Sequence, residues 1–115
     1  MALLSILSVD RLGGCVLDGV AASVGGDLMP NGGQEALAIV NGSGAPITVT
    51  AAITELVDGV TPAGKAITVA AGKTAIFGPF PPSEYNNGQR QVAFTYSAVT
   101  TVTVKAIQLI GVANT

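Results

Sequence analysis

The sequence predicts an all-β fold, a small β-sandwich or barrel of about seven to eight short antiparallel strands. Two observations carry this prediction. Apolar and polar residues alternate in runs of strand length, and clusters of turn-forming residues separate these runs at short intervals. A chain of 115 residues suffices for one hydrophobic core. We therefore expect a Gly-rich N-terminal segment over residues 1–34, followed by one β-sandwich domain over residues 35–115.

The N-terminal segment contains seven glycines and shows only weak periodicity. One short strand is expected around residues 15–17. Two interpretations of this segment stay open. It is either the first hairpin of the sandwich, joined by Gly-rich loops, or an extended arm that contacts another subunit.

Short apolar runs between turn signals predict strands at residues 37–40, 66–69 and 74–77. A longer strand is predicted over residues 47–54, where every second residue is Ile, Val or Ala and the residues between them are mostly Thr. This period of two is typical of a strand that buries one face.

The same alternation predicts strands over residues 92–97 and 102–105. After Ala106 the apolar phase shifts to Ile107 and Leu109, which indicates a bulge or a change of neighbouring strand. The predicted core comprises Val49, Ile53, Phe94, Tyr96, Val102 and Val104.

Charged residues make up only 10% of the chain, whereas an ordinary soluble domain has about 25%. Hydrophobic residues make up 49%. Such a chain has little charge to discourage association, so we expect a subunit that covers part of its surface with neighbours. The expected assembly interface is the apolar N-terminus, with Leu3, Leu4, Ile6, Leu7 and Val9.

The charge pattern also disfavours two classes of partner. The seven acidic and five basic residues are scattered singly, so we expect no nucleic-acid partner. No apolar run approaches the ~18 residues of a membrane-spanning helix, so we expect no membrane partner. The N-terminus lacks a basic region and soon reaches Asp10, so we expect no secretory signal.

Residues suited to catalysis are scarce. The chain has no His, which is the commonest general base and metal ligand, and one Cys cannot assemble a zinc site. The acidic residues do not follow the spacing of a calcium-binding loop. We therefore expect neither an enzyme nor a bound metal or cofactor, and we expect Cys15 to act as a small buried hydrophobic residue.

Two local motifs allow more than one interpretation. The triplet Asn41-Gly42-Ser43 matches a glycosylation sequon, but a turn with a positive φ at Asn41 explains it better. The Pro-rich corner after residue 77 is either a cap on the core or a contact corner formed by Phe80 and Tyr85.

Three stretches resemble the small head-decoration (cement) proteins of tailed bacteriophages: IVNGSGAPITV at residues 39–49, VAAGKT at residues 69–74, and FGPF at residues 77–80. The resemblance covers roughly residues 37–110. It implies a compact β-rich protein, made in the host cytoplasm, that binds the major capsid protein on the outer surface of the virion and self-associates as a homotrimer. It carries no catalytic residue.

Other functions stay open beside this one. Phage tail and fibre modules also use small β-sandwiches. A free carbohydrate- or peptide-binding module is a further alternative, although the absence of Trp counts against a sugar-binding platform.

Overall fold

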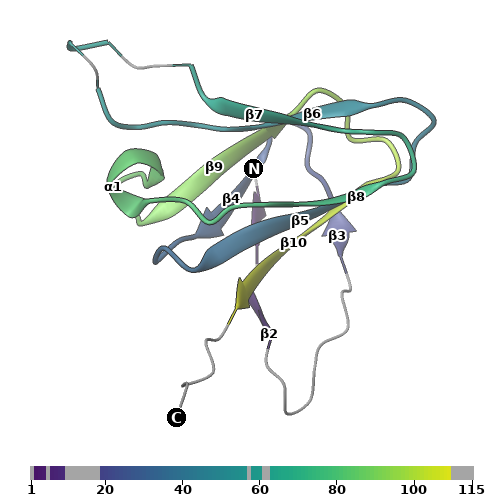
Figure 1. Ribbon diagram of the computed structural model, residues 1–115, viewed down its shortest axis with the longest axis horizontal. Helices are drawn as coiled ribbons and strands as arrows, with labels where there is room; N and C mark the ends of the chain where they lie inside the picture. The colour runs from purple at the N-terminus through teal and green to yellow at the C-terminus, as the bar shows by residue number, and fades with distance from the viewer. Residues whose placement is uncertain (1, 5, 10–18, 57, 61–62, 110–115) are drawn as a thin grey trace.

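Two β-sheets pack face to face in the computed structural model, which describes residues 2–4, 6–9, 19–56, 58–60 and 63–109 (Figure 1). Sheet A contains, in spatial order, β1 (Ala2–Leu3), β4 (Asp27–Pro30), β9 (Gln91–Tyr96), β6 (Ile47–Ala51) and β7 (Lys65–Val69). Sheet B contains β2 (Ile6–Val9), β10 (Val102–Leu109), β5 (Glu35–Asn41) and β8 (Thr74–Phe77), and β3 (Val20–Ala21) also pairs with β10. One short helix, α1 (Pro82–Tyr85), lies between β8 and β9.

The predicted all-β class is confirmed, and of the two expected architectures the chain forms the sandwich. Two details of the prediction are wrong. The described residues form ten strands, because the Gly-rich segment contributes very short strands that leave no periodic signal. Two strand pairs, β1–β4 and β2–β10, are parallel rather than antiparallel.

The strands predicted after residue 35 are all present, with one boundary error. Strand β6 ends at Ala51, and the chain then leaves the sheet. The amide of Thr54 donates a hydrogen bond to the carbonyl oxygen of Glu84 at 2.7 Å, beside α1. Ile53 therefore lies outside the strand and is only half-buried, so its assignment to the core is wrong.

Of the other predicted core residues, Tyr96 is half-buried and packs against the core. Four are buried as predicted: Val49, Phe94, Val102 and Val104.

Strand β10 shows which alternative explains the phase shift after Ala106. It pairs with β5 in an unbroken register from Val102 to Gln108, so this ladder contains no bulge. On its other edge, β10 pairs first with β3 and then, from Ala106 onward, with β2. The change of neighbouring strand is the alternative that the structure supports.

The described part of the N-terminal segment belongs to both sheets of this same chain. Strands β1 and β4 lie in sheet A, and β2 and β3 lie in sheet B. Leu4 and Ala22, which flank these strands, are buried in the core. The strand expected at residues 15–17, with Cys15, falls outside the described residues.

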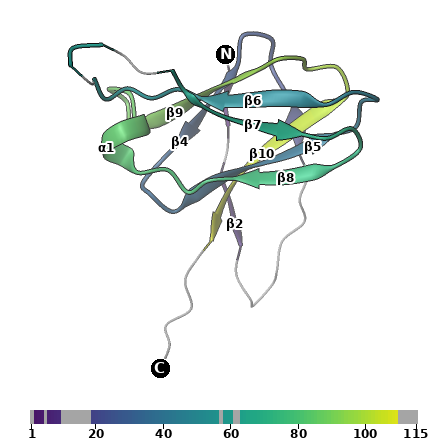
Figure 2. The ribbon, with the colours of Figure 1, turned by 45° about the horizontal axis from the view of Figure 1, so that its top comes forward.

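Aromatic rings join the two sheets at one end of the core. The ring centroids of Phe77 and Phe80 lie 4.9 Å apart, and those of Phe80 and Phe94 lie 5.4 Å apart, both in edge-to-face geometry. Phe77 ends β8 in sheet B and Phe94 lies in β9 of sheet A, so Phe80 bridges the layers. Figure 2 shows β8 and β9 approaching α1 at this end of the sandwich.

Candidate functional site: an apolar groove and two outer faces poor in charge

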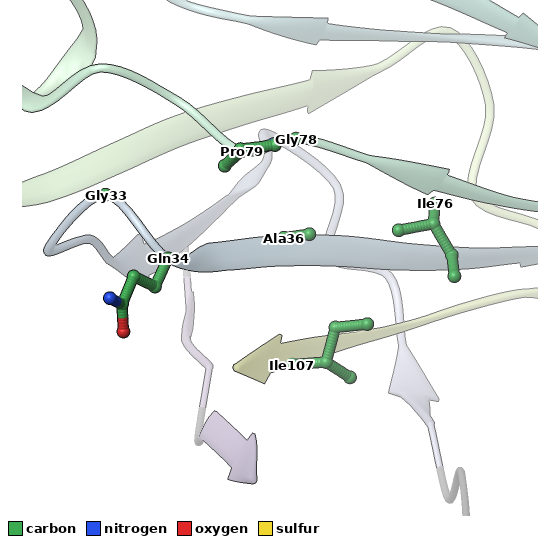
Figure 3. Close-up of a pocket in the computed structure, with 7 residues that line it drawn as sticks. All are labelled: Gly33, Gln34, Ala36, Ile76, Gly78, Pro79 and Ile107. Carbon is green, nitrogen blue, oxygen red and sulfur yellow. The ribbon is translucent and has the colours of Figure 1, made fainter. Parts of the chain in front are cut away.

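A groove of about 450 Å³ opens on the outer face of sheet B (Figure 3). This volume lies in the range of sites that bind small ligands, roughly 300–1,000 Å³. The lining residues come from β5, β8, β10 and the segments that adjoin them: Gly33, Gln34, Ala36, Ile76, Gly78, Pro79 and Ile107. Gln34 is the only one of them with a polar side chain, so the groove suits an apolar group.

Strand register brings the apolar side chains of the groove together. Ala36 on β5 pairs with Ile107 on β10, and the neighbouring Ala38 pairs with Ile76 on β8. Since Leu37 points into the core, Ala36 and Ala38 point outward on either side of it. Ile76 is 65% exposed, which is unusual for a large aliphatic side chain in a strand.

Gly78 leaves room for the groove beside Ala36. Its φ of +141° lies in a region that other residues rarely adopt. A Cβ atom added at Gly78 would lie 2.9 Å from the Cβ atom of Ala36. The close approach of these two backbone segments therefore requires glycine.

A buried carboxylate fixes the Gly33-Gln34 end of the groove. Glu35 is 5% exposed, and its two oxygens accept hydrogen bonds from the amides of Gly32 at 2.6 Å and Gln34 at 3.1 Å. The side chain of Asn31 accepts a further hydrogen bond from the amide of Gly33 at 3.0 Å. This rim is therefore held in place by three hydrogen bonds to its backbone.

The two outer faces carry almost no charge. At the outward positions of the described strands of sheet A, the side chains are mostly Thr and Ala and none is charged. In the described strands of sheet B, Lys105 is the single charged side chain at an outward position, in the same row as Ala38 and Ile76. Among the other exposed charges of the described residues, Glu84 lies in α1. The rest lie in loops or at a strand edge: Glu55, Asp58, Lys65, Lys73 and Arg90.

The predicted N-terminal interface residues do not form a single patch. Leu3 is 58% exposed in sheet A, whereas Leu4 is 4% exposed and belongs to the core, because its backbone amide bonds to Leu28 and turns the side chain inward. Ile6 and Leu7 are half-buried on β2 in sheet B. Leu7 pairs with Ile107, which extends the apolar row beside the groove. Val9 lies in β2, and its side chain is outside the described residues.

The predicted contact corner is mainly part of the core. Phe80 is 3% exposed, and the half-buried Tyr85 packs on it with ring centroids 5.1 Å apart. The side-chain amide of Asn31 donates hydrogen bonds to the carbonyl oxygen of Phe80 at 3.0 Å and to the side-chain oxygen of Asn86 at 2.8 Å. Phe80 is thus unavailable to a partner. Of the two interpretations of this corner, the cap on the core is the one that fits Phe80.

Asn41 is a buried hydrogen-bonding centre, not a turn residue with positive φ. The residues other than glycine with positive φ among those described are Asp58, Arg90 and Thr101. Asn41 ends β5, is fully buried, and donates from its side-chain amide to the carbonyl oxygens of Ala45 at 2.8 Å and Val69 at 3.0 Å. Its side chain therefore joins the loop between β5 and β6 to the end of β7, which gives Asn41 a structural role.

A partly buried polar pair, Asp27 on β4 and Tyr96 on β9, joins two neighbouring strands of sheet A. The Tyr96 hydroxyl donates a hydrogen bond to Oδ2 of Asp27 at 2.8 Å, and the amide of Ser23 donates to the same oxygen at 3.2 Å. Oδ1 of Asp27 has no hydrogen-bond partner among the described residues. Burial, together with the hydrogen bond and the charge of Asp27, raises the pKa of the Tyr96 phenol above its usual range.

The described residues contain no group of three or more His, Cys, Asp or Glu side chains that could hold a metal ion. In the same part of the chain, no helix has the length and apolar character needed to cross a bilayer. No protein-family model, curated protein or solved structure matches this chain.

Sequence reasoning missed most of the groove. Strand register, which is needed to bring Ala36, Ile76 and Ile107 together, depends on pairings between distant segments. One signal was available: Ile76 and Ile107 each place an aliphatic side chain where the alternation of their strand requires an outward-facing residue.

Proposed function

We propose that the chain is a non-enzymatic structural protein of a bacteriophage virion. In this proposal it is a decoration, or cement, protein that binds the major capsid protein on the outer surface of the shell and stabilises the shell. The resemblance of residues 37–110 to such proteins supports the assignment to a bacteriophage virion. The physical support comes from the outer faces of the sandwich.

The observation that carries the proposal is the outer face of sheet A. Five strands present Thr, Ala and other uncharged side chains over a continuous surface, with no charged residue at the described outward positions. A face that remains in water usually carries charged side chains, which keep it soluble and separate from neighbours. An uncharged face can be covered by another protein without the cost of desolvating ions.

A free binding module is the second candidate, and the groove favours one form of it. Its apolar lining suits an aliphatic group of a peptide better than a sugar. All three Phe side chains are buried and both Tyr side chains are half-buried, so none of these aromatic rings forms an open platform for a sugar ring. This arrangement disfavours the carbohydrate-binding alternative.

The proposal is tested by binding the purified chain to capsid shells assembled without it. We expect the wild type to sediment with the shells and to raise the temperature at which they break. Thr50→Lys places a charge at the centre of the sheet A face, where Thr50 pairs with Thr95 and Ala66. This change should weaken shell binding by about tenfold or more, because the ammonium group loses its water on contact.

Ala71→Lys is the matched control, since Ala71 is exposed in the turn between β7 and β8 and lies outside that face. It should bind as the wild type does. Failure of the wild type to bind the shells, or equal binding by the wild type and Thr50→Lys, would contradict the proposal.

A further inference from the structure

The loop between β6 and β7 presents two large aliphatic side chains to solvent. Leu56 is 58% exposed and Val60 is 67% exposed. Between them, Asp58 and Gly59 have φ values of 52° and 76°, the combination that produces a tight reversal of the chain. We call Leu56 and Val60 the knob. In Figures 1 and 2 the described parts of this loop extend beyond the body of the sandwich.

The base of this loop is anchored. Besides its amide bond to Glu84, Thr54 donates a hydrogen bond from its hydroxyl to the carbonyl oxygen of Asn86 at 2.7 Å. The hydrogen bonds of Thr54 therefore hold the start of this loop in place. A loop held in this way loses less conformational entropy when a partner covers the knob.

The knob and the groove have complementary chemistry. The groove lining is apolar, and the neighbouring outward position on β10 carries the basic Lys105. The loop that carries the knob has two exposed acidic side chains, Glu55 and Asp58. None of the described residues that line the groove is acidic, and the nearby Glu35 is buried with both oxygens bonded to backbone amides. Apolar contact and opposite charge thus favour the same pairing.

One molecule does not satisfy this pairing by itself. The loop joins two strands of sheet A, whereas the groove opens on the outer face of sheet B, which points away from sheet A. Within the chain, Leu56, Val60 and Ile76 all remain more than half exposed.

We propose that copies of this chain associate head to tail, with the knob of one copy bound in the groove of the next. The contact joins two different surfaces, so each copy offers one knob and one groove. Contacts of this kind close into a ring or continue as a filament, depending on the rotation between neighbours. This inference builds on the proposed role as an assembly subunit, but its test needs no viral particle.

Sedimentation velocity of the full chain over a range of concentrations tests the proposal. The wild type should self-associate, and Leu56→Asp and Ile76→Asp should each raise the dissociation constant by about tenfold or more. Both side chains are well exposed, so the fold should survive, which circular dichroism and thermal melting will verify. Val24→Asp is the control, because Val24 is 83% exposed in the turn before β4 and belongs to neither surface.

A mixing experiment distinguishes this contact from a symmetric one. Leu56→Asp retains an intact groove, and Ile76→Asp retains an intact knob. At a concentration where the wild type associates and each variant alone is monomeric, an equimolar mixture should form dimers and nothing larger, because a single working contact remains. Lys105→Glu should weaken association, and adding Asp58→Lys to it should restore association.

A wild type that stays monomeric at every concentration would overturn the proposal. Association of both Asp variants at the wild-type level, or a mixture that remains monomeric, would do the same. Shell binding is measured separately. Self-association through the knob without shell binding would support this inference and contradict the proposed function, and shell binding by a chain that does not self-associate would do the reverse.

Discussion

Phe94 shows how a single side chain connects both layers of the sandwich. It is fully buried on β9, and its ring lies within 5.4 Å of Phe80 and 6.2 Å of Phe77, measured between centroids. The alternation of residues 92–97 predicted its burial correctly. The alternation did not predict its contacts, because Phe77 and Phe80 belong to a corner whose position depends on the packing of both sheets.

Replacing Phe94 with Ala should lower the free energy of unfolding by about 3–5 kcal/mol, since it removes a large buried ring and leaves a cavity. Chemical denaturation measures this change. Thr95→Ala, at the exposed neighbouring position, should change the free energy by less than about 0.5 kcal/mol. Similar losses in the two variants would mean that the strand faces are assigned in reverse.

The pair of Tyr96 and Asp27 should make the fold sensitive to alkali. Burial is the main cause of the raised pKa of Tyr96, and the hydrogen bond to Asp27 and its charge add to it. The folded protein therefore holds the phenolic proton more tightly than the unfolded chain does. The resulting stabilisation is fully present below a pH of about 10, the usual tyrosine pKa, and is lost as the pH rises above that value.

Wild-type stability should therefore fall more steeply than that of Tyr96→Phe between about pH 10 and about pH 11. The upper limit of the difference is about 1.4 kcal/mol per pH unit. Solvent screening of the half-buried phenol reduces it. Urea denaturation at each pH measures the two slopes. Parallel slopes would show that the phenol titrates alike in the folded and unfolded states.

At the scale of elements, the sequence predicted the strands with clear alternation and missed those without it. Strands β5 to β10 were found because each has a run of apolar and polar residues that local chemistry explains. Strands β1 to β4 are two to four residues long, and their pairing depends on strands far away in the chain. The end of β6 was placed too late because Ile53 continues the pattern after the backbone has turned toward Glu84.

Gly78 offers a test of the junction between β8 and the groove. Gly78→Ala should lower the free energy of unfolding by about 1–3 kcal/mol, because Ala is strained at this φ and its Cβ would press on Ala36. Gly44→Ala is the matched control, since a Cβ atom there meets nothing within 4 Å. Thermal melting compares the two variants. Equal melting temperatures would show that the backbone at Gly78 can relax without cost.

At the scale of the whole molecule, the structure shows where the few charged residues lie. Two carboxylates, Asp27 and Glu35, are buried, and the exposed charges lie mainly in loops. The faces of the two sheets are therefore poorer in charge than the composition alone indicates. The low charge predicted a subunit that covers part of its surface, and the apolar N-terminal run predicted where the interface lies. Of the residues predicted for that interface, Leu4 belongs to the core.

The proposed role requires that this chain be part of a particle. Cryo-electron microscopy of virions produced from the genome that encodes the chain tests this requirement most directly. We expect density that fits the two-sheet sandwich, repeated regularly on the outside of the shell, with the outer face of sheet A against the major capsid protein. Purified virions whose protein content and density maps both lack the chain would contradict the account.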